Sequence, residues 1–415
     1  MVERNWAGNH TYRAERVARP TSTEQLQELV AGAERVRALG SRHSFTDLTD
    51  TKGLLVSLAD LASDPVLDET EHTVTVGAGQ DYGAVAVALE DRGWALANLA
   101  SLPHISVAGA VATGTHGSGD RLPSLSAAVA AIELVGPDGE LHAVARGDAG
   151  FEGSVVSMGA LGVVTRLTLD IEPTYPMRQD VYTGMPWRVV ESEFDAITGA
   201  ADSVSLFTRL DDRGVLQVWC KSRSTDAAVD LFGSPRAAGP THMLDGAPAD
   251  SVTDQSGALG PWLERLPHFR REFTPSRGEE LQSEYLVDRS VALDALAALR
   301  ALEPRLRSVL QSVEIRTVAA DELWLGSSYR RPTVGFHFTW LLDEPAVYAV
   351  LPEIEAALLP LWARPHWGKC FAATADDLEP LYPRWEDFRA LRASVDPGGK
   401  FGNAFLDRVL GHPLP

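Results

Sequence analysis

The stretch that decides the fold is "NLASLPHISVAGAVATGTHGSG", residues 98–119, which contains no Asp, Glu, Lys or Arg and many small side chains. A helix on the surface of a globular protein needs a polar face, and this stretch does not provide one. Small side chains instead let the backbone come close to another group. We therefore expect a closely packed loop segment here rather than a regular surface helix.

A second loop of this kind is "GSRHSF", residues 40–45, directly after the apolar "VRAL" of residues 36–39. Two glycine- and serine-rich loops that each adjoin a strand can surround a pyrophosphate with backbone N–H groups. Each loop carries a histidine, His43 or His116, without the neighbouring ligands that a metal site requires, so we expect no metal. From the pattern alone, a structural role accounts for both histidines at least as well as a role in binding.

A third glycine pattern, "VTVGAGQDYGAVAVAL" at residues 74–89, imitates a nicotinamide-dinucleotide fingerprint. Its glycine spacing is GxGxxxG instead of GxGxxG, and no acidic residue ends a strand about 20 residues later. We interpret it as a strand-to-helix turn whose glycines serve packing.

The chain of 415 residues is long enough for two domains. Helix and strand patterns joined by glycine-rich loops fill residues 1–171, and Pro173 and Pro176 mark a boundary. Residues 172–365 alternate strands with helices, which predicts an antiparallel sheet covered by helices on one face. Residues 366–415 return to glycine-rich, mixed sequence, and we expect them to rejoin the first domain.

Two predicted strands of the second domain carry polar residues at alternate positions. Glu314 and Arg316 lie two apart in "VEIRT" and project from one face, since side chains alternate along a strand. His337 and Thr339 do the same in "FHFTW". A solvated outer face would show this alternation too, but these four side chains also suit the binding of several hydroxyl groups. Lys369 in "RPHWGK" is a further candidate, although a lone lysine is most often a surface charge.

The composition excludes several classes of protein. A net charge of −20 argues against nucleic acid or an anionic membrane surface as a partner. Two widely separated cysteines exclude a disulfide scaffold and favour a reducing compartment. The N-terminus has no apolar signal region, and no run approaches the roughly 20 apolar residues of a membrane span. We expect a cytoplasmic protein.

Several of these motifs occur together in one known family. In chain order they are "NWAGN", "GSRHSF", "NLASLPHISVAGAVATGTHGSG", "EIRTVAAD", "HFTW", "RPHWGK" and "KFGNAF". Over essentially its whole length, the chain resembles the alditol oxidases, including xylitol oxidases, within the vanillyl-alcohol-oxidase type of FAD flavoproteins. The resemblance implies an α+β fold with a PCMH-type FAD-binding domain and a substrate domain built on an antiparallel sheet. We expect a monomer.

The resemblance also implies a covalently bound FAD. His43 matches the histidine that the family joins to the 8α carbon of the flavin, and an unprotonated imidazole nitrogen is a competent nucleophile for that bond. A covalent link also makes the flavin more oxidising, which favours removal of hydride from an unactivated alcohol. The other residues expected to contact FAD are Gly40, Ser41, Arg42, Ser44, Ser101, Ser106, Gly109, Ala112, Thr113, Gly114, Thr115, His116, Gly117, Gly162 and Val164.

The substrate that the resemblance implies is a polyol such as xylitol or sorbitol. Its terminal primary hydroxyl would be oxidised to the aldose by hydride transfer to flavin N5, while O2 is reduced to H2O2. His337 is our candidate for the base, with Lys369 and Arg316 polarising the hydroxyl and stabilising charge on the reduced flavin, and Lys369 is the alternative base. The residues expected to hold the polyol are Ser101, Glu314, Arg316, Thr339 and Lys369.

Arg42 departs from many wider relatives, which have glycine at this position. Because a bulky residue is strained at positive φ, we expect an ordinary negative φ here. We also expect the guanidinium to point away from the isoalloxazine, toward the cofactor phosphates or solvent.

Three other functions are compatible with parts of the sequence. An oxidase or dehydrogenase of gulono- or arabinono-1,4-lactone on the same fold would use a similar Glu-x-Arg pair and histidine. A carbohydrate- or flavin-binding protein without turnover would keep its yellow colour under anaerobic polyol. A nicotinamide-dependent dehydrogenase would need the fingerprint that residues 74–89 do not provide.

Overall fold

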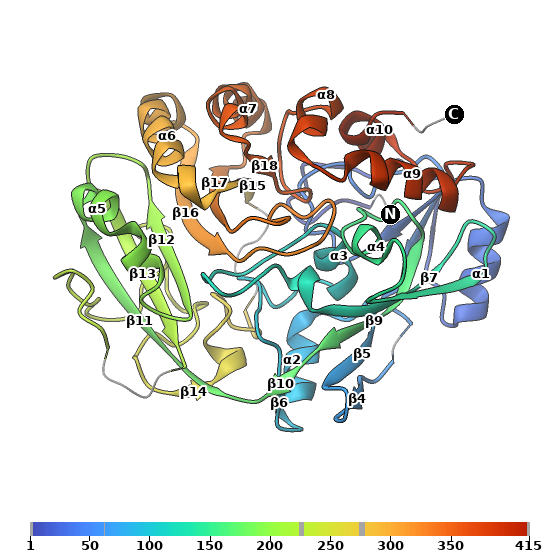
Figure 1. Ribbon diagram of the computed structural model, residues 1–415, viewed down its shortest axis with the longest axis horizontal. Helices are drawn as coiled ribbons and strands as arrows, with labels where there is room; N and C mark the ends of the chain where they lie inside the picture. Colours follow the sequence, from blue (N-terminus) through green and yellow to red (C-terminus); the bar gives the residue numbers. More distant parts are fainter. Residues whose placement is uncertain (1–2, 62, 224–227, 274–278, 413–415) are drawn as a thin grey trace.

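The computed structural model describes residues 3–61, 63–223, 228–273 and 279–412, and its strands form two groups that face each other (Figure 1). Residues 98–119 contain one short helix, α3 (Val107–Ala112), whose Val107, Ala110 and Val111 are buried. As expected from its small residues, the stretch therefore forms no surface helix.

The N-terminal region is built on two small sheets within the described residues. One is parallel with the order β1-β3-β2, and the other is antiparallel with the order β4-β5-β9-β7-β8. The strands are β1 (Arg16–Ala18), β2 (Val36–Leu39), β3 (Leu54–Ser57), β4 (Val66–Asp68), β5 (Thr73–Gly77), β7 (Val129–Val135), β8 (Leu141–Ala145) and β9 (Val163–Asp170). The helices of this region besides α3 are α1 (Thr23–Gly32), α2 (Tyr82–Glu90) and α4 (Phe151–Val155). A short pair, β6 (Trp94–Ala95) with β10 (Glu172–Pro173), lies where the chain leaves this region.

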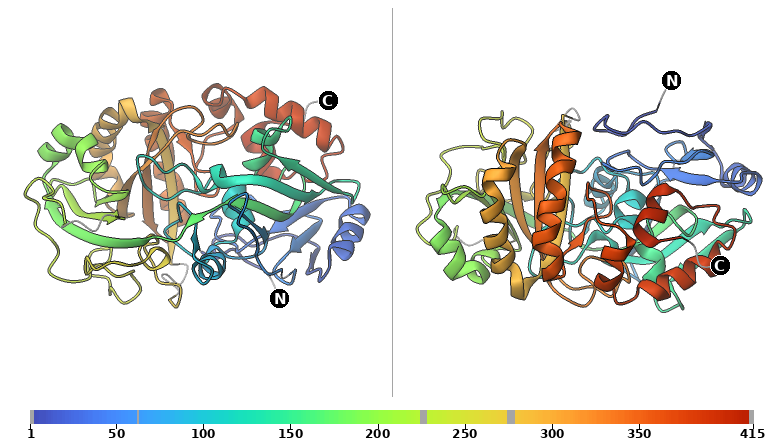
Figure 2. Two further views of the ribbon diagram at one scale, coloured as in Figure 1. Left: turned by 60° about the horizontal axis from the view of Figure 1, so that its bottom comes forward. Right: turned by 90° about the horizontal axis from the view of Figure 1, so that it is seen from above.

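The second region is dominated by one large antiparallel sheet. Within the described residues its order is β14-β11-β13-β12-β16-β17-β15-β18. The strands are β11 (Pro176–Met185), β12 (Ser203–Thr208), β13 (Val215–Ser222), β14 (Gly260–Pro261), β15 (Glu280–Asp288), β16 (Leu310–Val318), β17 (Thr333–Leu341) and β18 (Arg364–Pro365). Helices α5 (Trp187–Thr198), α6 (Ala292–Leu306) and α7 (Glu344–Leu358) lie on one face of it (Figure 2).

Alternation along the central strands explains why helices cover one face only. In β16 and β17, Val313, Ile315, Phe336 and Phe338 are buried in the main apolar cluster, which also contains residues of α6 and α7. The intervening polar residues project from the opposite face, toward the N-terminal region. The predicted α+β class and the antiparallel sheet with helices on one face are confirmed.

The C-terminal segment lies against the N-terminal region (Figure 1). Val36 donates its backbone N–H to the carbonyl of Lys400, and the Arg37 guanidinium donates to the carbonyl of Phe401. The helices here are α8 (Ala375–Leu378), α9 (Trp385–Val395) and α10 (Ala404–Leu410). The boundaries predicted after residues 171 and 365 stay predictions, because the main apolar cluster runs through both regions. Among the described residues, no helix has the length and apolar character to cross a membrane.

Candidate active site

A cavity of about 240 Å³ lies between the glycine-rich loops of the N-terminal region and the polar face of the large sheet. The predicted site residues that line it are Gly40, Ser41, Arg42, His43, Ser44, Ser101, Ser106, Gly109, Thr113, Thr115, His116, Glu314, Arg316, His337, Thr339 and Lys369. The predicted residues outside its lining are Ala112, Gly114, Gly117, Gly162 and Val164. The two loops and the two polar strand pairs therefore form one site.

The two predicted loops hold each other directly. The backbone N–H of Ser41 donates to Ser106 Oγ at 3.2 Å, and the backbone N–H of Ser106 donates to Ser41 Oγ at 3.0 Å. A Cβ atom added to Gly40 would lie 2.5 Å from Ser106 Oγ, so this approach requires glycine. The paired serines thus join both loops into one wall of the cavity.

His43 lies in this wall and stacks against an aromatic side chain. The indole of Trp6 stacks on its imidazole with ring centroids 5.2 Å apart and an interplanar angle of 29°. Its Nδ1 is buried and has no hydrogen-bond partner among the described residues. Burial, aided by the charge of His104, lowers the pKa of His43 to about 4. The imidazole is therefore neutral at pH 7.

The expectation of a negative φ at Arg42 is wrong, because its φ is +67°. The N-terminal segment holds it in this conformation. The backbone N–H of Trp6 donates to the Arg42 carbonyl at 2.9 Å, and the Arg42 guanidinium pairs with Glu3 at 2.7 Å. Left-handed backbone costs a non-glycine residue about 1–2 kcal/mol, which these contacts offset. The guanidinium points to Glu3 and is 36% exposed, at the solvent edge of the cavity.

Arg42 variants should reverse the usual order of alanine and glycine. Arg42→Ala and Arg42→Gly both lose the pair with Glu3, so only the backbone distinguishes them. Because φ is +67°, we expect Arg42→Gly to be the more stable of the two by about 1 kcal/mol. Thermal unfolding of both variants measures the difference. The usual order, with alanine more stable, would mean that residue 42 has a negative φ in solution.

The opposite wall of the cavity is a grid of polar residues from three neighbouring strands. His337 on β17 lies between Glu314 on β16 and Glu284 on β15 in the sheet register. In the next row of the grid, Thr339 pairs with Ser312 on one side and with Gln282 on the other. Side chains in such rows share a face, so this wall presents carboxylates, hydroxyls and an imidazole together.

Glu284, which the sequence reasoning missed, is the centre of charge in this wall. Its buried carboxylate accepts a hydrogen bond from Arg316 Nη2 at 2.6 Å and another from Lys369 Nζ at 2.6 Å. His116 Nε2 lies 3.3 Å from the same carboxylate. Despite burial, the two cations and His116 hold the pKa of Glu284 well below its usual value. The two predicted cations are therefore fixed by a shared carboxylate.

Glu314 and His337 form a second buried contact beside the first. His337 Nδ1 lies 3.3 Å from Glu314 Oε2, while His337 Nε2 is buried without a partner among the described residues. Arg316, His268 and His337 keep the pKa of Glu314 well below its usual value against the effect of burial, so Glu314 is a carboxylate. Its oxygen must accept from His337 Nδ1–H, which leaves Nε2 with a bare lone pair. Burial, followed by the charge of Lys369, lowers the pKa of His337 to about 4.

The structure adds lining residues that were not predicted. They include Trp6, Phe207, His268, Glu280, Gln282, Glu284, Ser312 and His366. Glu280, Gln282 and Glu284 alternate along β15, a pattern as readable as that of β16. His268 lies between elements in a segment without periodicity, so nothing in its surroundings marked it. Among the described residues, no group of three or more His, Cys, Asp or Glu side chains is arranged to hold a metal ion.

The similarity to known proteins extends over nearly the whole chain. Residues 14–145 match the family described as FAD binding domain, and residues 275–409 match the family described as D-arabinono-1,4-lactone oxidase. The alditol oxidase of Streptomyces sp. (strain IKD472 / FERM P-14339) is 47% identical over 409 residues, covering 98% of each chain. The L-gulono-1,4-lactone dehydrogenase of Mycobacterium tuberculosis (strain CDC 1551 / Oshkosh) is 28% identical, again covering 98% of each chain.

The fold has solved counterparts at much lower identity. The crystal structure of cholesterol oxidase from B. sterolicum superposes with a TM-score of 0.82 at 17% identity, covering 99% of this chain and 96% of that chain. This likeness shows the fold alone. The 47% identity along nearly the full length shows the family. The chain belongs to the alditol oxidases of the vanillyl-alcohol-oxidase type of FAD flavoproteins.

Proposed function

We propose that this chain is an FAD-dependent alditol oxidase that converts the terminal primary hydroxyl of a polyol such as xylitol or sorbitol to the aldehyde of an aldose. The observation that carries the proposal is one cavity with two walls of different chemistry. One wall is the serine-joined pair of glycine-rich loops with His43, and the other is the polar grid around His337. The 47% identity to an alditol oxidase supports the same substrate class.

The loop wall fits a flavin dinucleotide. Gly40 and Gly109 let the two loops pack closely around Ser106, since an added Cβ would lie 2.5 Å or 2.7 Å from its Oγ. Backbone close to a ligand is what a pyrophosphate site requires. His43 offers a buried, unpartnered Nδ1 on a neutral imidazole, which suits a nucleophile. We propose that His43 carries the FAD covalently through the 8α carbon.

The polar wall supplies the proton chemistry. When bound, FAD would supply the acceptor for the hydride of the substrate carbon and the route by which O2 is reduced to H2O2. His337 Nε2, held bare by Glu314, takes the hydroxyl proton, and Lys369 and Arg316 stabilise the negative charge that develops on the oxygen. Ser101, Thr339 and Gln282 also line the cavity and orient the remaining hydroxyls.

Anaerobic titration tests this function. Xylitol or sorbitol should bleach the yellow protein rapidly, and readmission of O2 should restore the colour with one H2O2 per polyol consumed. A protein that stays yellow under saturating polyol would contradict the proposal and would favour binding without turnover.

A lactone is the second candidate substrate, because residues 275–409 match the D-arabinono-1,4-lactone oxidase family. The relatives with lactone names in this comparison have 24–29% identity, against 47% for the alditol oxidase. Steady-state rates with gulono- and arabinono-1,4-lactone, measured beside those with xylitol and sorbitol, distinguish the two. Faster turnover of a lactone than of either polyol would assign the lactone activity.

His43→Ala is expected to bind FAD without a covalent bond. Acid precipitation of the wild-type protein should leave the yellow colour on the precipitate, and its intact mass should include one FAD. The variant should release all its flavin, because alanine offers no nucleophile. His72→Ala, a histidine outside the cavity lining, is the control and should keep the covalent flavin. Full release of flavin from the wild-type protein would contradict the link.

We also propose that the enzyme works in the cytoplasm without nucleic acid as a partner. Support comes from the net charge of −20 and from Cys220 and Cys370, which are both buried and unpaired. The expectation of a monomer stays a prediction.

A further inference from the structure

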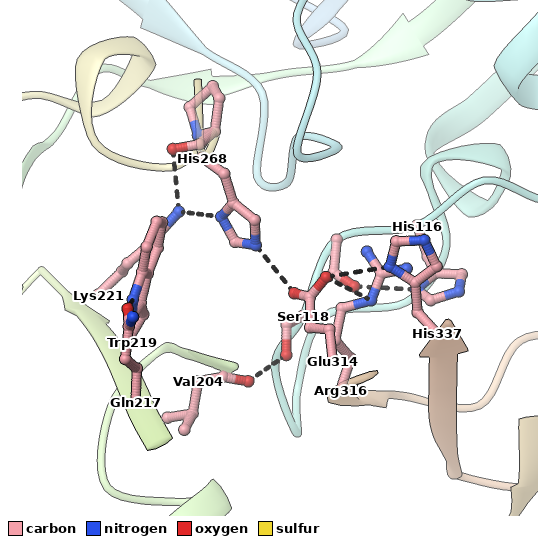
Figure 3. Close-up of polar contacts among 12 residues, drawn as sticks. His116, Ser118, Val204, Gln217, Trp219, Lys221, His268, Glu314, Arg316 and His337 are labelled. Carbon is pink, nitrogen blue, oxygen red and sulfur yellow. Dashed lines mark hydrogen bonds and ion pairs between the residues drawn. The ribbon is translucent and has the colours of Figure 1, made fainter. Parts of the chain in front are cut away.

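From Glu314 in the polar wall, a line of buried polar groups leads away from His337 (Figure 3). His268 Nε2 lies 2.8 Å from Glu314 Oε1, the oxygen opposite the one that faces His337. His268 Nδ1 lies 2.9 Å from the Nζ of Lys221 on β13. Lys221 and His268 are 1% and 5% exposed, so this line is shielded from solvent.

Lys221 has no carboxylate partner within ion-pair distance among the described residues, although it is fully buried. Its Nζ donates to the carbonyls of Leu266 and Pro267 at 2.6 and 2.9 Å and lies against His268 Nδ1. An ammonium has three N–H donors, and here each has one acceptor. In the ammonium form of Lys221, the third acceptor is His268 Nδ1, which offers its lone pair.

The position of the hydrogens in the rest of the line follows from this contact. With Nδ1 as acceptor, a neutral His268 carries its hydrogen on Nε2 and donates it to Glu314 Oε1. If the shared proton moves from Lys221 to Nδ1, His268 still keeps its Nε2 hydrogen toward Glu314. In both cases Glu314 receives a donor and keeps an unprotonated oxygen for His337 Nδ1–H.

We propose that Lys221 and His268 are positioning residues that act through Glu314 to hold His337, a residue of the cavity lining, in the tautomer with a bare Nε2. The expected effect on the rate of flavin reduction rests on the proposed function. The expected tautomer of His337 rests on the geometry alone. Without Lys221, His268 is free to carry its only hydrogen on Nδ1. A proton on Glu314 Oε1 would then face His268 Nε2, and Oε2 would become a neutral carbonyl oxygen, a weaker acceptor that no longer holds the hydrogen of His337 on Nδ1.

The neighbouring charges determine how acid should affect this arrangement. His337 faces Glu314, Glu284, Lys369 and Arg316, while His268 faces Lys221, Glu314 and Arg316. Burial lowers the pKa of Lys221 to about 7, and the charge of Glu314 opposes that shift. Burial and the Lys221 charge lower the pKa of His268 to about 4. Removing Lys221 should therefore raise the pKa of His268.

A variant of a neighbouring buried residue can show whether Lys221 serves packing alone. Gln179 on β11 pairs with Lys221 in the sheet register and is also fully buried. Its side-chain amide donates to the carbonyl of Asp254 at 3.1 Å, so it anchors the same segment that carries His268. Gln179→Met removes this anchor but none of the hydrogen bonds that join Lys221, His268, Glu314 and His337. It is the control for lost packing.

The first experiment compares two His268 variants of the holoenzyme. His268→Gln keeps an N–H donor for Glu314, whereas His268→Leu removes it. In anaerobic stopped-flow with xylitol, we expect the rate constant of flavin reduction to stay within about threefold in His268→Gln and to fall about 10- to 100-fold in His268→Leu. The xylitol Kd should change less than threefold in both. An equal loss in the two variants would overturn the proposal.

The second experiment removes Lys221 in two backgrounds. Lys221→Met should lower the reduction rate constant about tenfold in the wild-type protein but leave it unchanged in His268→Gln, whose amide donor cannot change tautomer. Gln179→Met should lower the thermal midpoint while the rate constant stays within about threefold. The proposal would be overturned if Lys221→Met lowered the reduction rate constant by the same factor in both backgrounds. It would also be overturned if Gln179→Met lowered that rate constant about as much as Lys221→Met does.

A third readout is independent of turnover. Long-range 1H–15N spectra of protein labelled with 15N-histidine report which ring nitrogen carries hydrogen, and His337→Asn assigns the His337 signal. We expect one tautomer, with hydrogen on Nδ1, in the wild-type protein and a mixture in Lys221→Met. A wild-type His337 with hydrogen on Nε2 would overturn the inference even if polyols are oxidised. Failure of wild-type turnover with the expected spectrum would instead reject the proposed substrate.

Discussion

Glu284→Gln is expected to lower the thermal unfolding midpoint by about 5 to 10 °C, the largest stability effect of any single polar substitution in the site. The carboxylate of Glu284 receives Arg316 and Lys369 at 2.6 Å each in a fully buried position. A glutamine leaves both cations without a counter-charge, and breaking a buried pair in this way costs about 3–5 kcal/mol.

Glu353→Gln is the matched control, because it also removes a carboxylate from an arginine. Its partner Arg305 is 68% exposed, and pairs of this kind contribute about 0–1 kcal/mol. Differential scanning calorimetry of both variants measures the contrast. Equal midpoints for the two variants would show that Arg316 and Lys369 do not depend on Glu284 for their charge balance.

The effect of Glu284→Gln also has a pH dependence of defined sign. The folded state holds the pKa of Glu284 well below its usual value, so its stabilising contribution is complete above that usual value, about 4.5. The contribution is lost as the pH falls through the folded pKa. The gap between wild-type and variant midpoints should therefore be constant from about pH 8 to 5.5 and shrink below about pH 4.5. A gap that widens toward acid would contradict this assignment.

Strand alternation let the sequence predict most of the polar wall. Glu314, Arg316, His337 and Thr339 all line the cavity, as their spacing of two residues required. The solvated alternative failed because the N-terminal region covers this face, which no local pattern reveals. The glycine-rich loops were readable for a related reason, since close backbone approach selects small residues over many consecutive positions.

Contacts between distant segments were beyond local patterns. Lys221 sits in "VLQVWCKS", where a polar residue near a strand end usually faces solvent, and His268 lies in a segment without periodicity. Their meeting depends on how residues 262–270 fold back, and the backbone N–H of His268 also donates to the carbonyl of Ser101 at 3.0 Å. The prediction of a negative φ at Arg42 was wrong for the same reason. Its positive φ depends on contacts with Glu3 and Trp6, which lie nearly 40 residues away in the sequence.

His337→Asn is expected to lower the rate constant of flavin reduction by a polyol about 100- to 10,000-fold, the usual contribution of a general base. Asparagine places an amide N–H near the position of imidazole Nδ1, so the hydrogen bond to Glu314 is retained while the Nε2 lone pair is lost. The fold should therefore survive, and the xylitol Kd should change only a few-fold. Anaerobic stopped-flow measures the rate constant and the Kd separately.

The pH dependence decides between His337 and Lys369 as the base. His337 has a pKa of about 4, so protonation of this imidazole should leave the wild-type rate constant unchanged above pH 6 and lower it as the pH approaches 4. His337→Asn should lack this acidic limb. Lys369 donates to Glu284 at 2.6 Å, so its lone pair is available only after that ion pair loses a proton. A rate constant that rises toward alkaline pH and survives His337→Asn would assign the base to Lys369, whereas an acidic limb that disappears with the imidazole assigns it to His337.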